Sequence, residues 1–412
     1  MTLEEMGKRA KAAARKLATA GKGKEEALLH GGEALWERRE EILAANALDV
    51  EAGRERGMTQ ALLDRLTLTE ERIKDMAKAV EDVAKAPDPV GKVLSGGVLE
   101  NGLKIQKVTV PLGVIGIIYE ARPNVTSDAA ALCLKAGNAV ILRGGKEAFR
   151  SNQAVTKVLR DALEERGLPA DCVQLVEDTS RQSAQELMTL TDYLDVLIPR
   201  GGAGLIRSVK ENARVPVIET GVGNCHVYVD ASAQVDMAAN IVYNAKTSRP
   251  SVCNAMETLL VHQDIAEKAL PAIKAKLDQK QVELRGCERT RAILPGIKAA
   301  EEADWETEYL DYILAVRVVD SLDQALEHIA RYSTGHSECI VTENYSNAQR
   351  FLNEVDSAAV YVNASTRFTD GGQFGLGAEI GISTQKLHAR GPMGLEQLTS
   401  YKFLIEGSGQ VR

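Results

Sequence analysis

The chain has 412 residues, of which 44% are hydrophobic and 26% charged, the ordinary balance of a soluble globular protein with two or three domains. Its net charge of −8, without a long basic tract, argues against nucleic acid and anionic membranes as partners. No apolar run approaches the ~20 residues that span a bilayer, and the start of the chain shows no secretory pattern. We therefore expect a cytoplasmic protein.

The cysteines and histidines are scattered. Six cysteines occur without a Cys-x-x-Cys pair, and the six histidines form no His-x-x-x-His pair. Free thiols fit this spacing better than disulfides do, and we expect no metal centre.

Residues 1–85 read as helices. Thr2–Glu5 has the pattern of a capping box, and the apolar residues that follow recur at helical spacing up to Leu17. A further helix is predicted to begin after Thr69 and to end before Pro87.

The next segment changes to a strand pattern. Asn101-Gly102 separates Val98–Glu100 from the alternating Leu103–Val110, which predicts a projecting β-hairpin over residues 96–112 with a type I′ turn. The tail Leu398–Ile405 alternates in the same way and is expected to join that sheet. An exposed edge of this kind invites a partner strand, so we predict a homo-oligomer.

From Val114 onward, short apolar strands alternate with helices. Strands are predicted at Val114–Tyr119, Ala139–Arg143, Val173–Val176, Asp195–Ile198 and Val215–Glu219. Intervening helices are predicted at Val125–Ala136, Ala148–Arg166 and Gln182–Leu190. This pattern is typical of the α/β class with a doubly wound parallel sheet.

A second α/β set follows residue 230. Helices are predicted at Gln234–Asn244, Ile265–Lys280 and Ser346–Val355, and strands at Thr258–Val261, Ile313–Val319 and Glu338–Val341. We place the first part of the chain at 1–230, the second at 231–366, and a C-terminal return to the first part at 367–412.

Three polar groups near strand ends are the parts for covalent acyl chemistry. Cys253 lies in a loop of small residues, which favours a reactive thiol, whereas Cys133, Cys225 and Cys339 read as core residues. Glu219 and Asn124 would supply a proton acceptor and an oxyanion donor. Glu219 could equally be a solvated strand end, and Asn124 a helix N-cap.

Two glycine turns suggest a dinucleotide site. Gly201 and Gly202 open a helix after a strand, where backbone N–H groups can hold a pyrophosphate. Arg143 and Lys146 flank a second turn that follows another strand. Neither turn has the Gly-x-Gly-x-x-Gly pattern, so solvated turns remain the alternative.

Several stretches resemble the aldehyde dehydrogenase superfamily, and the similarity runs over essentially the whole chain. They are Ile117–Thr126, Ala136–Gly145, Ile218–His226, Asn244–Asn254, Asp311–Val316 and Tyr361–Thr369. The resemblance implies an aldehyde-dehydrogenase-like fold, with a parallel-sheet cofactor domain, an α/β catalytic domain and a β-hairpin oligomerisation element.

The resemblance also implies residue roles. Cys253 matches the nucleophile, Asn124 the oxyanion amide, and Glu219 the carboxylate that activates water in hydrolytic members. The implied cofactor-binding residues are Arg143, Gly201 and Gly202, with Glu308 on the nicotinamide-side ribose.

Departures from the hydrolytic pattern refine this expectation. The segments Arg122–Asn124, Glu219–Val222 and Pro250–Cys253 differ from the hydrolytic motifs, which puts water activation by Glu219 in doubt. Lys146 stands where hydrolytic members tend to carry an acidic ribose ligand, and a cation there suits NADP.

The implied activity is NADPH-dependent reduction of L-glutamyl 5-phosphate to glutamate 5-semialdehyde and phosphate, for proline biosynthesis. A free thiol has a pKa of ~8.5, so Lys246 and Arg249 are expected to favour the Cys253 thiolate.

Further substrate contacts are expected from cations near the catalytic groups and from the glycine-rich loop Gly371–Gly381. The candidates are Arg122, Lys246, Arg249, Arg367 and Ser383. Docking of glutamate 5-kinase is a further possible partnership. The alternatives are a hydrolytic aldehyde dehydrogenase and a cysteine acyltransferase or hydrolase without a redox cofactor.

Overall fold

The computed structural model describes residues 1–412, apart from the side chain of Ala61, and the chain forms two compact units. The first unit comprises Met1–Thr220, Gly375–Gly381 and Met393–Arg412, and the second comprises Gly221–Phe374 and Ile382–Pro392. The first unit thus ends before residue 230, because β7 (Cys225–Val229) pairs with strands of the second unit. The C-terminal return is shared between the two units.

Helices open the first unit, as predicted. They are α1 (Leu3–Leu17), α2 (Gly23–Glu37), α3 (Arg39–Glu55), α4 (Gln60–Leu66) and α5 (Glu70–Lys85). The predicted capping box is confirmed, since the Thr2 hydroxyl accepts the Glu5 N–H at 3.2 Å and the Glu5 carboxylate accepts the Thr2 N–H at 3.0 Å. Thr69 caps α5, since its hydroxyl accepts the Arg72 N–H at 3.2 Å.

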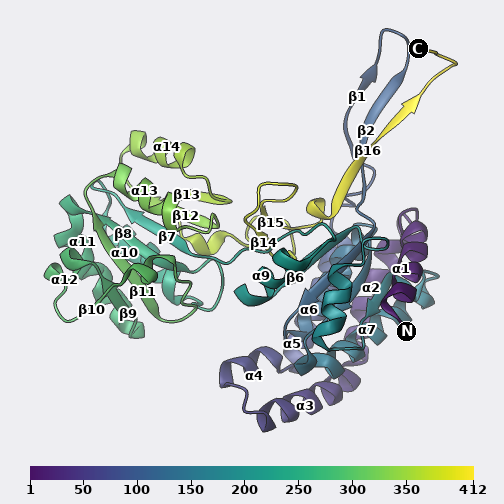
Figure 1. The fold of residues 1–412 in the computed structure, drawn as a ribbon, viewed down its shortest axis with the longest axis horizontal. Coiled ribbons are helices and arrows are strands. Elements are labelled where there is room, and N and C mark those ends of the chain that lie inside the picture. The colour runs from purple at the N-terminus through teal and green to yellow at the C-terminus, as the bar shows by residue number, and fades with distance from the viewer. The chain divides into compact units, whose positions relative to one another are not determined.

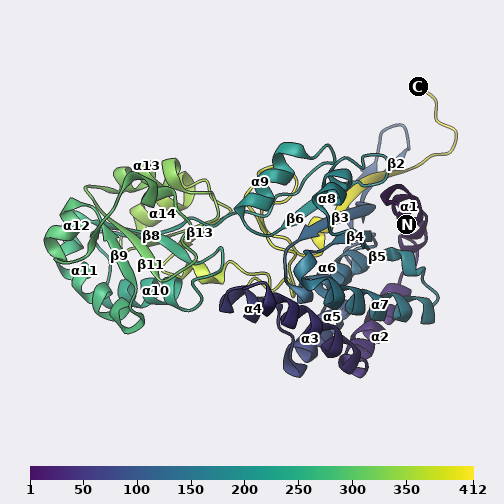
Figure 2. The same cartoon turned by 60° about the horizontal axis from the view of Figure 1, so that its bottom comes forward.

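The sheet of the first unit is parallel, with strand order β5-β4-β3-β6. Its strands are β3 (Val114–Tyr119), β4 (Ala139–Arg143), β5 (Val173–Leu175) and β6 (Val196–Arg200). The connecting helices are α6 (Pro123–Lys135), α7 (Phe149–Glu165), α8 (Arg181–Met188) and α9 (Ala203–Asn212). Figure 2 shows the strands side by side in this order. One face is covered by α1, α8 and α9, whose apolar side chains share a core with the strands.

The predicted strand Val215–Glu219 is wrong. The segment makes only an isolated bridge, Leu197 with Val217, and two backbone hydrogen bonds to Leu197. Pro216 has no N–H to donate, so the segment cannot continue a ladder along β6. Glu219 therefore follows an irregular segment and not a strand.

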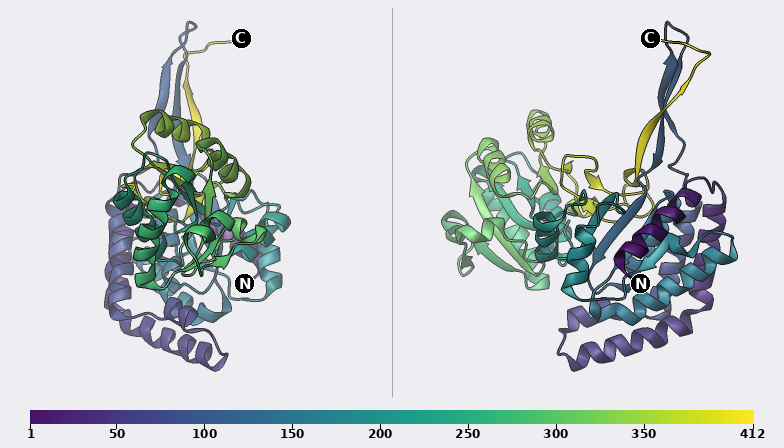
Figure 3. Two further views of the ribbon diagram at one scale, coloured as in Figure 1. Left: turned by 90° about the vertical axis from the view of Figure 1, so that its left-hand side faces the viewer. Right: turned by 45° about the vertical axis from the view of Figure 1, so that its right-hand side comes forward.

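The predicted hairpin and tail form one antiparallel sheet. β1 (Val93–Val98) pairs with β2 (Lys104–Pro111), and β16 (Thr399–Glu406) pairs with the other edge of β2. These strands run together away from the rest of the first unit (Figures 1 and 3).

The type I′ turn predicted for the hairpin is wrong. Gly102 has φ +84°, whereas Asn101 is not left-handed, and a type I′ turn needs both. The Gly102 N–H donates to the Leu99 carbonyl at 2.9 Å, and the Leu99 N–H donates to Leu103 at 2.8 Å. This pattern is a longer loop with a glycine bulge, which also uses Asn-Gly.

The second unit is built on a parallel sheet with strand order β10-β9-β11-β8-β7-β12-β13. Besides β7, its strands are β8 (Met256–His262), β9 (Glu283–Gly286), β10 (Lys298–Ala299), β11 (Ile313–Val319), β12 (Ser337–Val341) and β13 (Ala359–Val362). Its helices are α10 (Val235–Thr247), α11 (Gln263–Leu277), α12 (Glu288–Ile293), α13 (Leu322–Tyr332) and α14 (Tyr345–Glu354). A short pair, β14 (Ile382–Ser383) and β15 (Gly391–Pro392), completes it.

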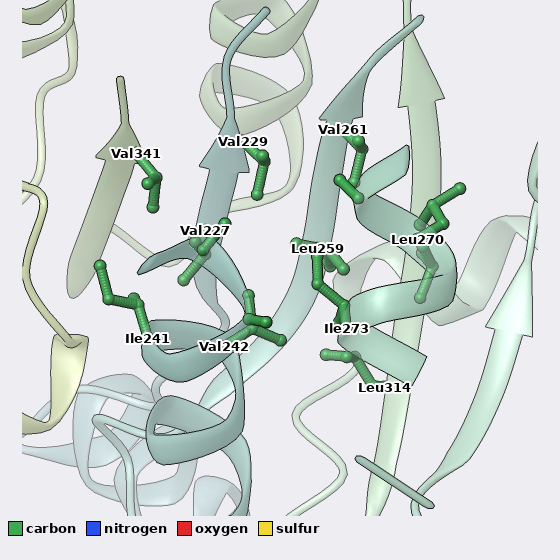
Figure 4. Close-up of a cluster of buried hydrophobic side chains, with 14 of the residues drawn as sticks. Val227, Val229, Ile241, Val242, Leu259, Val261, Leu270, Ile273, Leu314 and Val341 are labelled. Atoms are coloured by element: carbon green, nitrogen blue, oxygen red, sulfur yellow. The ribbon is translucent and has the colours of Figure 1, made fainter. Parts of the chain in front are cut away.

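Both faces of this sheet are covered. Side chains of α10 and α11 pack against alternate residues of β7 and β8, such as Val227 and Leu259, as Figure 4 shows. Tyr228, between Val227 and Val229, instead joins the core with α13 and α14 on the opposite face. The near-continuous apolar strands follow from this two-sided burial.

The remaining short elements are 3-10 turns, and no helix among the described residues is long and apolar enough to cross a membrane. The turns are Lys146–Ala148, Ala170–Cys172, Asp278–Lys280, Glu302–Glu306, Thr366–Phe368 and Glu396–Leu398.

Candidate active site

Cys253 lies in the second unit, in the loop between the end of α10 and the start of β8. Its residue is half-buried, in contrast to Cys133, Cys225 and Cys339, which are buried as predicted. The Cys225 thiol donates to the Cys253 carbonyl at 3.2 Å, so it supports the loop from beneath. Burial raises the pKa of Cys225 well above its usual value, which keeps that second thiol protonated.

Gly223 holds the loop from another side, and the sequence reasoning missed it. A Cβ at this position would overlap the Cys253 carbonyl oxygen, so only glycine fits. The Gly223 N–H donates to the Glu308 carboxylate at 2.8 Å. The glycine-rich run Gly221–Gly223 after Glu219 was the signal that could have revealed this close approach.

One arginine, Arg249, lies in the cysteine loop, and a second, Arg367, contacts the loop. The Arg367 guanidinium donates to the Ser248 hydroxyl at 3.0 Å and also to the side-chain oxygen of Asn254. Burial and the nearby Arg249 cation lower the pKa of Arg367, while its electrostatic interaction with Cys253 acts in the opposite direction. Arg367 thus interacts electrostatically with both Arg249 and Cys253, and a cation near a thiol favours the thiolate.

Lys246 is placed differently from the prediction. Its side chain is 0% exposed and forms an ion pair with the equally buried Glu257 at 2.5 Å. Burial lowers the pKa of Lys246 and raises that of Glu257 to about 7. Lys246 faces the interior because it lies on the buried side of α10, so its charge is directed to Glu257 and not to the loop surface.

Two further predicted residues of the second unit are fixed by local contacts. Burial raises the pKa of Glu308, although the Gly223 amide lowers it in part. Ser383 is fully buried in β14, and its hydroxyl accepts the Gln385 N–H at 3.3 Å. Glu308 is thus bonded to Gly223, the residue that lies against the Cys253 carbonyl.

In the first unit, Asn124 is the second residue of α6, and Arg122 is the N-cap. The alternative of Asn124 as an N-cap is therefore wrong, because the helix begins at Pro123, two residues earlier than the predicted start at Val125. The exposed Asn124 side chain donates to the Asp128 carboxylate at 3.0 Å. Burial raises the pKa of Asp128 to about 6. Asp128, missed from the sequence, is one helical turn on from Asn124.

Arg143 is the last residue of β4, and Lys146 follows the carboxyl end of this strand. The Arg143 guanidinium donates to the carbonyls of Thr179 at 2.7 Å and Ser180 at 2.6 Å, and burial lowers its pKa. Lys146 opens a 3-10 turn and is exposed. Arg143 therefore shapes the loop after β5, while the Lys146 ammonium is accessible.

Gly201 and Gly202 follow β6, and Gly202 is the N-cap of α9. The Gly202 N–H donates to the carboxylate of Glu120 at 3.1 Å. A Cβ at Gly201 would lie 2.6 Å from the Glu120 carboxyl carbon. The start of α9 therefore binds an anionic group, the Glu120 carboxylate. Such a helix N-terminus is suited to hold the pyrophosphate of a dinucleotide.

Glu219 forms an ion pair with Lys210 at 3.2 Å, and its side chain is 26% exposed. Among the described residues, no cluster of His, Cys, Asp and Glu is arranged to hold a metal ion.

Known proteins resemble this chain over essentially its whole length. A model of the aldehyde dehydrogenase family matches residues 1–304. The gamma-glutamyl phosphate reductase of Moorella thermoacetica is 65% identical, with 100% of this chain and 99% of that protein covered. The crystal structure of gamma-glutamyl phosphate reductase from Thermotoga maritima is 54% identical, covers 99% of each chain and gives a TM-score of 0.97.

A more distant structure shares the fold alone. The acetylating aldehyde dehydrogenase of Geobacillus thermoglucosidasius is 18% identical, with a TM-score of 0.70 over 99% of this chain and 97% of that chain. The predicted fold class is thereby confirmed. The chain belongs to the aldehyde dehydrogenase family and, within it, to the gamma-glutamyl phosphate reductases.

Proposed function

We propose that this enzyme reduces L-glutamyl 5-phosphate to L-glutamate 5-semialdehyde and phosphate with NADPH, in proline biosynthesis. The observation that carries the proposal is the half-buried Cys253 thiol in a loop that also carries Arg249, with the Arg367 guanidinium bonded to the neighbouring residue Asn254. The names of the similar proteins from Moorella and Thermotoga support the substrate.

The first step is acyl transfer to Cys253. The thiolate attacks the acyl carbon, a C–S bond forms, and the C–O bond to phosphate then breaks. Asn124 is the proposed oxyanion donor, because the Asp128 carboxylate orients its side-chain amide. Arg122, Arg249 and Arg367 are the proposed ligands of the anionic groups of the substrate, since guanidinium groups match phosphate and carboxylate geometry.

The second step is reduction of the thioester. NADPH, when bound, supplies the hydride that adds to the thioester carbon. The C–S bond then breaks, the aldehyde forms and Cys253 is released as thiolate. Gly201 and Gly202 would hold the pyrophosphate and Lys146 the additional phosphate of NADPH, with Arg143 shaping the neighbouring loop. Glu308 would hold the nicotinamide-side ribose.

Water must be kept from the thioester in this reaction. The ion pair between Glu219 and Lys210 supports a role for Glu219 other than water activation. Ser383 is the remaining proposed substrate-side residue, and its burial supports an indirect role through its loop.

Phosphate dependence tests the proposal. Glutamate semialdehyde and NADP are supplied with phosphate or without it, and NADPH is followed. The reductase chemistry requires phosphate in the reverse direction, and arsenate should replace it. NADPH formation at the same rate without phosphate would identify a hydrolytic dehydrogenase, with Glu219 as the base.

The arm formed by β1, β2 and β16 is the proposed self-association element. Apolar side chains such as Val98, Phe403 and Ile405 are exposed on it. Covering them with a second copy would remove apolar surface from water. Light scattering should give a mass above that of one chain, and a monomer at micromolar concentration would contradict this. Docking of glutamate 5-kinase and a cytoplasmic location remain further proposals.

A further inference from the structure

We infer that the buried Lys246–Glu257 pair is a positioning device that holds the Cys253 loop in register with the segment that carries Glu308. This inference rests on the proposed role of Cys253 as nucleophile. It assigns to Lys246 a role different from substrate binding.

The pair closes the cysteine loop at its two ends. Lys246 lies in the last turn of α10, and Glu257 is the second residue of β8. Their side chains meet at 2.5 Å with 0% exposure on either side. The loop that carries Cys253 is therefore bracketed by one ion pair, and its ends cannot separate without exposing or unpairing a buried charge.

The stability of the folded state does not by itself explain the presence of this buried ion pair. Removing two charges from water costs free energy that their attraction often fails to recover, and a well-packed apolar pair is frequently as stable. Desolvation here is severe, since burial lowers the pKa of Lys246 and raises that of Glu257. A pair that contributes little to stability is more readily explained by the geometry it enforces.

Glu257 also reaches a third segment. Its other carboxylate oxygen accepts the Leu310 N–H at 3.2 Å. Leu310 has φ +57°, a left-handed conformation that an ordinary leucine avoids, so this turn depends on its surroundings. Tyr309, the preceding residue, places its ring 5.9 Å from the Lys246 ammonium.

The contacts form a closed path through the site. Glu308, two residues before Leu310, accepts the Gly223 N–H at 2.8 Å. Gly223 in turn lies against the Cys253 carbonyl. The path from Glu257 through Leu310, Glu308 and Gly223 thus returns to the cysteine loop, and it fixes the loop relative to the proposed ribose ligand.

The test replaces the pair by apolar residues in the whole protein. The double variant Lys246→Met with Glu257→Leu keeps the side-chain volume about the same. It removes the ion pair and the hydrogen bond from Leu310 to Glu257. The rate at which iodoacetamide alkylates Cys253, followed by mass spectrometry without substrate, reports the loop directly. We expect this rate and kcat to fall at least about tenfold and the Kd of NADPH to rise, with a Tm near that of the wild type.

A folded double variant with alkylation, kcat and NADPH binding all within about twofold of the wild type would overturn the inference. If the double variant does not fold, Glu257→Gln decides in the same way, because it keeps the shape and the acceptor for Leu310. Lys24→Met is the matched control: Lys24 is a buried lysine of the first unit, paired with Asp88 at 2.9 Å. It should lower Tm without changing the alkylation rate.

The alkylation readout needs no substrate, so it separates this inference from the proposed function. Loss of the substrate assignment alone would leave the alkylation result standing. Full activity of Cys253→Ser would instead remove the nucleophile on which both depend.

Discussion

The two units place their candidate functional groups at opposite ends of their parallel sheets. In the first unit, Asn124, Lys146 and Gly202 follow the carboxyl ends of β3, β4 and β6. In the second unit, Gly223, Cys253 and the Glu308 segment precede the amino ends of β7, β8 and β11. The same architecture thus exposes two chemically different edges.

The difference teaches why the two edges need different residues. Helix N-termini follow the carboxyl ends of strands, and their N–H groups attract anions, as the Glu120 carboxylate at Gly202 illustrates. The cysteine loop follows the C-terminus of α10, whose dipole disfavours a thiolate. Arginine side chains are therefore the candidates for supplying positive charge there: Arg249 lies in the loop, and the Arg367 guanidinium bonds to Asn254, the neighbour of Cys253.

The largest effect should come from the nucleophile itself. Cys253→Ser should fold normally and lose at least about 1000-fold in kcat, because a hydroxyl is a far weaker nucleophile at neutral pH. Cys133→Ala is the control: its thiol is buried within α6, so stability should fall more than rate. Near wild-type turnover of the serine variant would end the covalent mechanism.

The pH dependence of stability should differ in sign between the units. Burial lowers the pKa of His336, in the second unit, to about 4 from 6.5, whereas it raises that of Asp128, in the first, to about 6. Neutral His336 stabilises the folded state above pH 6.5, and this contribution, about 3 kcal/mol, is lost as the pH falls towards 4. Asp128 opposes it, since its protonated form is favoured in the folded state below pH 6.

Denaturant unfolding at pH 7 and pH 4.5 measures this contrast. His336→Asn should lose less stability than the wild type on acidification, and Asp128→Asn should lose more. Equal acid sensitivity of all three proteins would show that neither group carries the difference.

Two glycines, one at each edge, provide a matched pair. Gly223→Ala should lower kcat about 100-fold, because its Cβ would overlap the backbone carbonyl of Cys253, which cannot move alone. Gly201→Ala meets the flexible side chain of Glu120 at 2.6 Å, which can swing away. Its effect should be confined to a few-fold rise in the KM of NADPH. Equal losses in kcat for the two variants would contradict the distinction between a glycine packed against backbone and a glycine packed against a flexible side chain.

The smallest of these effects concerns cofactor choice at the first edge. Lys146→Glu should raise the KM of NADPH about tenfold and that of NADH much less, because the exposed ammonium is the proposed partner of the additional phosphate. Lys157→Glu, on the outer part of α7, is a control of equal charge change. Equal affinities for both cofactors in the native and variant enzymes would remove Lys146 from the phosphate site.

Much of the fold follows from local pattern. The strands β3, β4, β8 and β11 and the long helices were predictable because apolar runs and their stop signals are properties of neighbouring residues. The errors arose where the conformation of a segment depends on residues that contact it from elsewhere in the chain. Val215–Glu219 has the composition of a strand, but Pro216 and the place beside β6 allow only a bridge. Asn101-Gly102 predicted the hairpin correctly but not its loop.

The sequence by itself determined which chemical groups this protein has available and on which kinds of element they stand: a thiol in a loop of small residues, an amide at a helix start, glycines before α9. Only the tertiary structure decided which charges face the thiol. Lys246 and Arg249 lie on one short segment, yet Lys246 is buried against Glu257 while Arg249 is exposed beside Arg367. Burial and pairing of a charge depend on segments distant in sequence, and no local period encodes them.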